Sequence, residues 1–166
     1  MWSWHIWCTD LPADQVYMAN KYGNSYTFMD RSLGATSALD DTGSLGMSYQ
    51  WGRKDPIPGS SKFYDMTEPT LYGSVTKVSV AASDASTGTI ANAIQNPITF
   101  LKAADWLFAG RTNYLWGNPQ GEEGLTATHQ KSIYDPCPPG YRIPGKDAFS
   151  IFTKTGENTT DPAQHN

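Results

Sequence analysis

The chain has 166 residues, of which 13% are aromatic and 17% are charged, and its net charge at pH 7 is −4. This length fits one domain with its own core, and 15 glycines with 11 prolines favour a loop-rich α+β domain over a helical bundle. The negative net charge does not favour binding to nucleic acid, and the sequence contains no run of about 20 apolar residues, the length that a membrane-spanning helix needs.

Two short strands are predicted in the first half of the chain. Residues 2–9 alternate apolar and polar side chains, which indicates a strand with one apolar face. That face would comprise Trp2, Trp4, Ile6 and Cys8. A second strand is expected over 25–31, with Tyr26 and Phe28 on the same face. Residues 52–59 follow as a loop stiffened by two prolines.

Two helices are predicted in the second half. Residues 60–95 are rich in small polar side chains and are interpreted as an insertion or a mobile arm, with a weak strand near Val78. Asn96 and Pro97 are typical of a helix start, and apolar residues at helical spacing follow them to about residue 108. The second helix is expected over 145–155.

The stretch 132–144 is the most rigid in the sequence. Its four prolines fix φ at four sites and remove four backbone donors, so neither a helix nor a central strand can run through it. We expect this loop to dock the following helix onto the aromatic sheet. Cys137 lies inside it, and the other cysteine is Cys8. One long-range disulfide and two buried free thiols are both compatible with the sequence.

No pattern of catalytic residues rises above background, and we expect a non-enzymatic domain without a resident cofactor. His5 lacks a second histidine or cysteine at ligand spacing, which favours a structural role over metal binding. Two acidic pairs in polar loops, 40–41 and 122–123, are the candidates for calcium, a cation that prefers oxygen ligands.

Aromatic and basic residues supply the binding candidates. Tyr114 and Trp116 flank polar loops and are predicted surface rings for a ligand, whereas Trp2, Trp4, Trp51 and Trp106 are assigned to the core. Arg53 and Lys54 could hold an anion; the alternative is a structural ion-pair set. That set would comprise Asp30, Arg31, Arg53, Asp55 and Arg142. Trp51 and Cys137 are expected to be structural as well.

Four segments in this order resemble a known family. They are WSWHIW at 2–7, MDRSLGA at 29–35, YQWGRKDP at 49–56 and KSIYDPCPPGYRIP at 131–144. The match is to the Fibrobacter succinogenes major paralogous domain, which also occurs as the C-terminal part of fimbrillin-like surface proteins. The resemblance covers nearly the whole chain, and the last motif is the most specific.

The resemblance implies a C-type-lectin-like α+β fold with short, mostly antiparallel strands, two helices and long loops. Residues 1–166 would form one such domain without the strands that usually follow the second helix. Two alternatives stay open: the chain is a fragment of the domain, or a neighbouring chain supplies those strands. The family also implies an extracellular place on the cell surface, through a lipid anchor or a fimbria outside this chain. The calcium-binding triplet of sugar-binding C-type lectins is not matched: 68–70 is Glu-Pro-Thr and 118–120 is Asn-Pro-Gln.

The expected function is ligand binding or adhesion within a fimbrial or lipoprotein assembly. Its partners would be other surface or pilus subunits, or a glycan or protein ligand. Two alternatives stay open at this point. One is a carbohydrate-binding module of a glycan-uptake system, and the other is a structural pilus subunit whose partner is a neighbouring copy.

Overall fold

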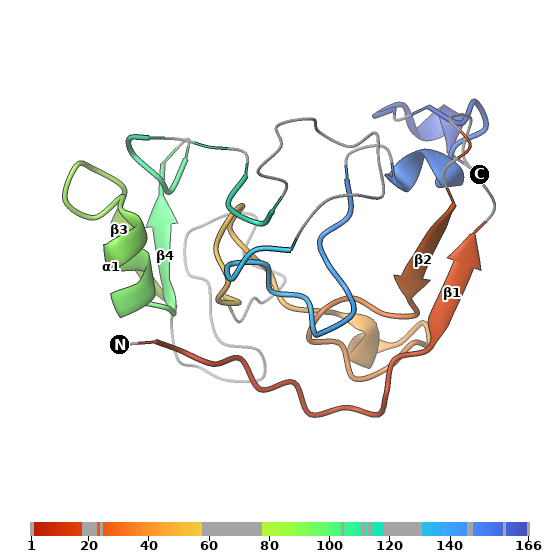
Figure 1. Ribbon diagram of the computed structural model, residues 1–166, viewed down its shortest axis with the longest axis horizontal. Helices are drawn as coiled ribbons and strands as arrows, with labels where there is room; N and C mark the ends of the chain where they lie inside the picture. Colours follow the sequence, from red (N-terminus) through yellow and green to blue (C-terminus); the bar gives the residue numbers. More distant parts are fainter. Residues whose placement is uncertain are drawn as a thin grey trace.

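The computed structural model describes residues 2–17, 23, 25–57, 78–103, 105–110, 112, 114–117, 131–145, 148–157 and 159–165. Two small sheets lie at opposite ends of the molecule, and long loops fill the space between them (Figure 1). The strands are β1 (Asp14–Tyr17), β2 (Tyr26–Met29), β3 (Ser79–Ala82) and β4 (Thr99–Lys102). The helices are α1 (Ile90–Gln95) and the 3-10 turns η1 (Thr42–Ser44), η3 (Ala148–Phe152) and η4 (Pro162–Gln164).

β1 and β2 form an antiparallel hairpin in which Asp14 pairs with Met29 and Tyr17 pairs with Tyr26. The strand predicted over 25–31 is therefore confirmed in its central four residues, and the ring centroids of Tyr26 and Phe28 lie 6.3 Å apart. The sequence interpretation missed β1, because its four residues include two polar side chains and all four are exposed.

The helix predicted over 145–155 is present only as the 3-10 turn η3. It docks on the hairpin through its rings: Phe149 and Phe152 have their centroids 5.9 and 5.8 Å from that of Phe28. Phe152 also meets Tyr17 edge-on at 4.9 Å. Five residues are too few for a regular α-helix, so these ring contacts rather than helix propensity hold the segment.

The strand predicted over 2–9 is wrong. Residues 2–8 are extended but belong to no strand among the described residues. The period-two alternation does exist, yet the inward side is the opposite one. Trp4 is 82% exposed, whereas Trp7 turns inward and its Nε1 donates to the carbonyl of Ala35 at 2.9 Å. Side-chain hydrogen bonds, not the count of apolar residues, decide which side faces the protein.

β3, α1 and β4 form a parallel β-α-β unit, in which Ser79 pairs with Thr99. The helix begins after Thr89, whose hydroxyl accepts from the Asn92 amide, and it ends at Asn96. The helix predicted to start at Asn96 is therefore wrong. Pro97 disfavours helical geometry in the residue before it, so this pair ends one helix instead of starting another.

The core lies beside this unit and comprises Ala93, Leu101, Trp106 and Leu107. Val78 is buried as well, and β3 and α1 lie within 78–95, the second part of the predicted insertion or arm. Residues 60–77, the rest of the predicted insertion, lie outside the described residues. Within the described chain, no helix has the length and apolar character needed to cross a bilayer.

Arg53 joins this unit to the loop at 50–57, because the residue is 3% exposed and its guanidinium group donates to backbone carbonyls. Nη1 donates to Thr99 at 2.6 Å, and Nη2 donates to the carbonyls of Asn96 and Pro97, both at 3.1 Å. These acceptors include the end of α1 and the start of β4. The neighbouring Gln50 completes the joint by exchanging two hydrogen bonds with the Leu101 backbone, as a paired strand residue would.

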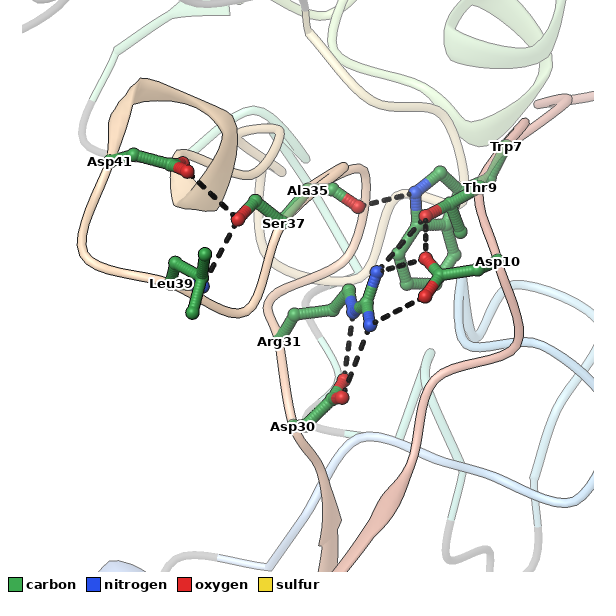
Figure 2. Close-up of polar contacts among 9 residues, drawn as sticks. All are labelled: Trp7, Thr9, Asp10, Asp30, Arg31, Ala35, Ser37, Leu39 and Asp41. Carbon is green, nitrogen blue, oxygen red and sulfur yellow. Dashed lines mark hydrogen bonds and ion pairs between the residues drawn. The ribbon is translucent and has the colours of Figure 1, made fainter.

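Arg31 joins the N-terminal segment to the end of β2 (Figure 2). Its Nε donates to Asp30 Oδ1 at 2.8 Å, and its Nη1 donates to Asp10 Oδ1 at 2.5 Å. Nη1 also donates to the Thr9 hydroxyl at 3.1 Å. Asp30 and Arg31, two residues of the predicted ion-pair set, thus form an ion pair with each other. Hydrogen bonds from Arg31 lower the pKa of both carboxyl groups below their usual value.

Asp135 organises the proline loop from inside. Its Oδ1 accepts from Lys131 Nζ at 2.7 Å and from the Cys137 amide at 2.8 Å, and its Oδ2 accepts from the Ile143 amide at 2.9 Å. One buried carboxylate thus fixes both ends of the loop. The two cysteines are free, with Cys8 exposed and Cys137 buried, so neither sequence alternative is fully correct. Burial raises the pKa of the Cys137 thiol to about 12.

We predict that Arg53→Met lowers the free energy of unfolding by about 3 kcal/mol, because it leaves several buried carbonyls without donors. Urea denaturation followed by circular dichroism measures this change. Lys102→Met, at an exposed position of β4, is the matched control and should shift stability by less than about 0.5 kcal/mol. Equal stability of the two variants would refute the role assigned to Arg53.

We also predict that Arg31→Gln destabilises the protein at pH 7 and that the deficit shrinks on acidification. The folded pKa values of Asp10 and Asp30 lie below the reference of 3.8. Their contribution is therefore complete above that pH and is lost as pH falls through the lowered values. Thermal melts of both proteins between pH 7 and pH 2 test this. A deficit that stays constant below pH 4 would contradict the ion-pair explanation.

Candidate functional site: an aromatic platform

Trp51 packs against Trp116 at the start of the 51–55 loop, and we call these two residues, with Tyr114 of the same turn as Trp116, the aromatic platform. The centroids of Trp51 and Trp116 lie 4.6 Å apart with their planes inclined at 60°. Trp51 is 54% exposed and Tyr114 is 39% exposed, whereas Trp116 is partly buried. The structure therefore brings Trp116, one of the two predicted surface rings, against Trp51, which sequence reasoning placed in the core.

Backbone carbonyls hold the platform in place. Trp116 donates from Nε1 to the carbonyl of Arg53 at 2.9 Å, and the buried Trp106 donates to the carbonyl of Trp51. Gly117 donates to Tyr114 at 3.0 Å and closes the turn that carries both outer rings. The indole of Trp116, anchored by its own N–H, loses little further entropy when a ligand binds, which favours recognition.

A second segment supports the platform from the proline loop. The amide of Ser132 donates to the carbonyl of Trp116 at 3.3 Å, and its hydroxyl donates to the carbonyl of Leu115. Gly117 and Lys131 form an isolated antiparallel bridge beside these contacts. Ser132 and Lys131 thus attach the platform turn to the proline loop, which the sequence predicts to be rigid.

The 51–55 loop depends on Gly52, which adopts a φ of +83°. A Cβ at this position would lie 2.6 Å from Cδ1 of Leu115, inside van der Waals contact. Leu115 lies between two platform residues. Glycine is needed here for backbone conformation and for space, since other L-residues avoid this region and would push the platform turn away.

The predicted anion site at Arg53 and Lys54 is not supported by the geometry. The guanidinium of Arg53 is enclosed by carbonyls, and burial lowers its pKa. The ammonium of Lys54 donates to Asp55 Oδ1 at 2.7 Å and to the carbonyl and hydroxyl of Ser3 at 2.9 and 2.5 Å. Three N–H groups therefore meet three acceptors. Both cations act as structural groups beneath the platform.

Three of the four tryptophans assigned to the core are exposed, and that prediction is wrong for Trp2, Trp4 and Trp51. Only Trp106 is buried, at the centre of the core cluster. The error has a physical cause: an indole that donates its N–H is favourable in the core, but an indole at a ligand-binding surface has the same sequence signature. Composition therefore separates the two poorly.

A groove of about 680 Å³ lies between β2 and the proline loop, away from the platform residues. Phe28 and Phe149 line it on the hairpin side, and Tyr141 and Arg142 line it on the loop side. The predicted ion-pair set is thus divided. Arg31 pairs with acids beside this groove, Lys54 pairs with Asp55 beside the platform, and Arg142 lies on the groove wall.

The calcium candidates are not assembled into a site within the described residues. The carboxylate of Asp41 accepts from the Gly43 amide at 2.7 Å and from the Ser37 hydroxyl at 3.0 Å, which stabilises a local turn (Figure 2). Asp40 is exposed beside it, and residues 122–123 lie outside the described part. No group of three acidic, histidine or cysteine side chains among the described residues is arranged to hold a metal.

His5 has a structural contact, in line with the sequence interpretation. Its Nδ1 lies 3.2 Å from the hydroxyl of Tyr49, a residue of the central loops. Desolvation lowers the pKa of His5, and burial raises that of Tyr49. Both shifts favour the uncharged forms, so this pair tethers the N-terminal segment and supplies no charged group for chemistry.

Comparisons with protein-family models, with curated proteins and with solved structures found no match to this chain. The lectin-like fold and the surface-protein family therefore stay predictions that come from the sequence motifs.

We predict that Gly52→Ala destabilises the protein by about 1 to 2 kcal/mol from backbone strain alone, with a further cost from the clash with Leu115. Gly140 is the matched control. Its φ is +88°, but a Cβ there would meet no atom within 4 Å, so Gly140→Ala carries the strain without the clash. Chemical denaturation of both variants measures the difference, and a smaller loss for Gly52→Ala than for Gly140→Ala would refute this account.

Proposed function

We propose that the chain is a non-catalytic ligand-binding domain of an extracellular surface protein, acting in adhesion within a fimbrial or lipoprotein assembly. The exposed, fixed ring of Trp51 against Trp116 carries the binding part of this proposal. The surface location rests on the four family-like motifs. Nearby, Arg53 donates to the carbonyl of Asn96 and Lys54 donates to Asp55, so both cations have structural partners, which supports binding over catalysis.

The platform favours a ligand with a flat, apolar surface. Large aromatic side chains contribute the most binding energy when they are held rigidly and shielded from water by their partner. Trp51 leaves more than half of its surface in solvent, while its own carbonyl is held by Trp106. The Trp51 ring packs against Trp116 yet keeps apolar surface in contact with water, and a ligand would remove that surface from water.

The same observation favours a second candidate, a carbohydrate-binding module. Sugar rings have flat C–H faces that stack on indole and phenol rings, and their hydroxyl groups need no charged partner. Both Nη groups of Arg53 and the ammonium group of Lys54 already donate to protein acceptors. An uncharged glycan therefore suits this surface better than an anionic ligand.

The experiment is a binding titration with a panel of soluble neutral polysaccharides, followed by tryptophan fluorescence and by calorimetry. We expect Trp51→Ala to weaken binding at least tenfold, which corresponds to about 1.4 kcal/mol. Trp4→Ala is the matched control, since Trp4 is an indole of the N-terminal segment that is 82% exposed and is not a platform residue. Its affinity should equal that of the unmodified protein.

Equal affinities of Trp51→Ala and Trp4→Ala would reject the platform as the binding surface. Absence of binding to every polysaccharide would reject the carbohydrate-binding candidate. The structural-subunit alternative has its own measurement. A molecular mass that rises with protein concentration in size-exclusion chromatography with light scattering, without any added ligand, would support it.

A further inference from the structure

We infer that the platform is one half of an extended site for a neutral oligosaccharide, and that Trp2 and Tyr134 form its second half. We call these two residues the second ring pair. This inference rests on the carbohydrate-binding candidate above. It adds a class of ligand, a chain of several uncharged sugar residues, and two contact residues that sequence reasoning did not assign to binding.

The second ring pair has the geometry of a stacking surface. The centroids of Trp2 and Tyr134 lie 6.3 Å apart, and their planes are inclined at 36°. Trp2 remains 40% exposed, and Tyr134 is partly buried. The Nζ of Lys54 lies 4.5 Å from the centre of the Trp2 ring, a distance that suits a cation–π contact. Trp2 is thus held from one side while part of its surface stays open.

Backbone contacts next to each ring restrict the pair. Ser3, which follows Trp2, accepts from Lys54 with its carbonyl at 2.9 Å, and its hydroxyl donates to Asp55. The amide of Tyr134 donates to the hydroxyl of Ser132 at 3.0 Å. These hydrogen bonds attach the N-terminal segment to the 51–55 loop without strand pairing, and they place Trp2 beside Tyr134.

Two connections join the second ring pair to the platform, one along the covalent chain and one through a hydrogen bond. Trp51 and Lys54 are three residues apart in one loop, which limits their separation to about 10 Å. Ser132, two residues before Tyr134, donates from its amide to the carbonyl of Trp116. The two ring pairs thus border the same short loop. A single sugar would meet one pair, and a chain of several sugars is needed to reach both.

The charges around the loop select an uncharged chain. Lys54 and Asp55 neutralise each other at 2.7 Å, and their side chains are only 10% and 8% exposed. An acidic sugar would have to compete with Asp55 and with the two Ser3 acceptors for the ammonium group. Neutral hydroxyl groups avoid that competition, so we expect little dependence of affinity on salt.

The test is a calorimetric series with a neutral oligosaccharide of increasing chain length, applied to the unmodified protein and to three variants. Affinity of the unmodified protein should rise with length. We expect long oligosaccharides to bind the unmodified protein about tenfold more tightly than short ones. Trp2→Ala should remove this increase in affinity and leave the affinity for short chains unchanged, whereas Trp51→Ala should weaken the binding of long and short chains alike. Trp4→Ala, two residues along the same segment, should behave as the unmodified protein. Near-ultraviolet circular dichroism verifies that each variant is folded.

A ring-preserving variant guards against a purely structural effect: Tyr134→Phe should keep the gain with length, and Tyr134→Ala should lose it. If Trp2→Ala and Trp4→Ala bind long oligosaccharides with equal affinity, the second ring pair is rejected as a contact site, and the platform is unaffected. If Trp51→Ala also has no effect, the proposed function itself fails. Tighter, salt-sensitive binding of an acidic oligosaccharide of equal length would overturn the choice of an uncharged ligand.

Discussion

The buried guanidinium of Arg53 is the contact on which the rest of this structure depends. It places a positive charge at the carboxyl end of α1, where the unpaired carbonyls carry partial negative charge. The same residue offers its own carbonyl to Trp116. The Arg53 side chain therefore binds the end of α1 and joins it to β4 through Thr99, while the Arg53 backbone holds Trp116 of the platform.

In the described part of this protein, polar side chains hold the segments together, as strand pairing does in a protein with a large sheet. Each described sheet has two strands, and a two-stranded sheet is at best marginally stable alone. Arg53 and Gln50 hold the β-α-β unit, Arg31 holds the N-terminal segment, and Asp135 holds the proline loop. Each of these polar groups is partly or fully withdrawn from water. Loss of any one donor or acceptor leaves its partners unsatisfied, so the loops should respond to such substitutions more sharply than a sheet would.

Sequence reasoning succeeded where a local rule decides the outcome. The alternating rings of Tyr26 and Phe28 mark β2, and the prolines of 132–144 mark a loop without regular structure. It failed where distant partners decide. Asn96 and Pro97 have the composition of a helix start, but Thr89 had already supplied the capping hydroxyl seven residues earlier. Asp135 lies within a recognised motif, yet its role depends on Lys131 and on an amide eight residues away.

The candidate site shows the same division. Tyr114 and Trp116 were predicted from their place beside polar loops, and the structure exposes Tyr114 and leaves Trp116 partly buried against Trp51. The sequence alone does not identify Trp51 or Trp2 as surface residues, because exposure depends on which side chains cover them.

The contrast between the two thiols has a practical consequence. Cys8 is open to solvent and Cys137 is buried with a raised pKa, so a maleimide dye should modify the folded protein at a single sulfur. That sulfur lies on the exposed side of the N-terminal segment, which makes it an attachment point for single-molecule adhesion measurements in which every copy is oriented alike.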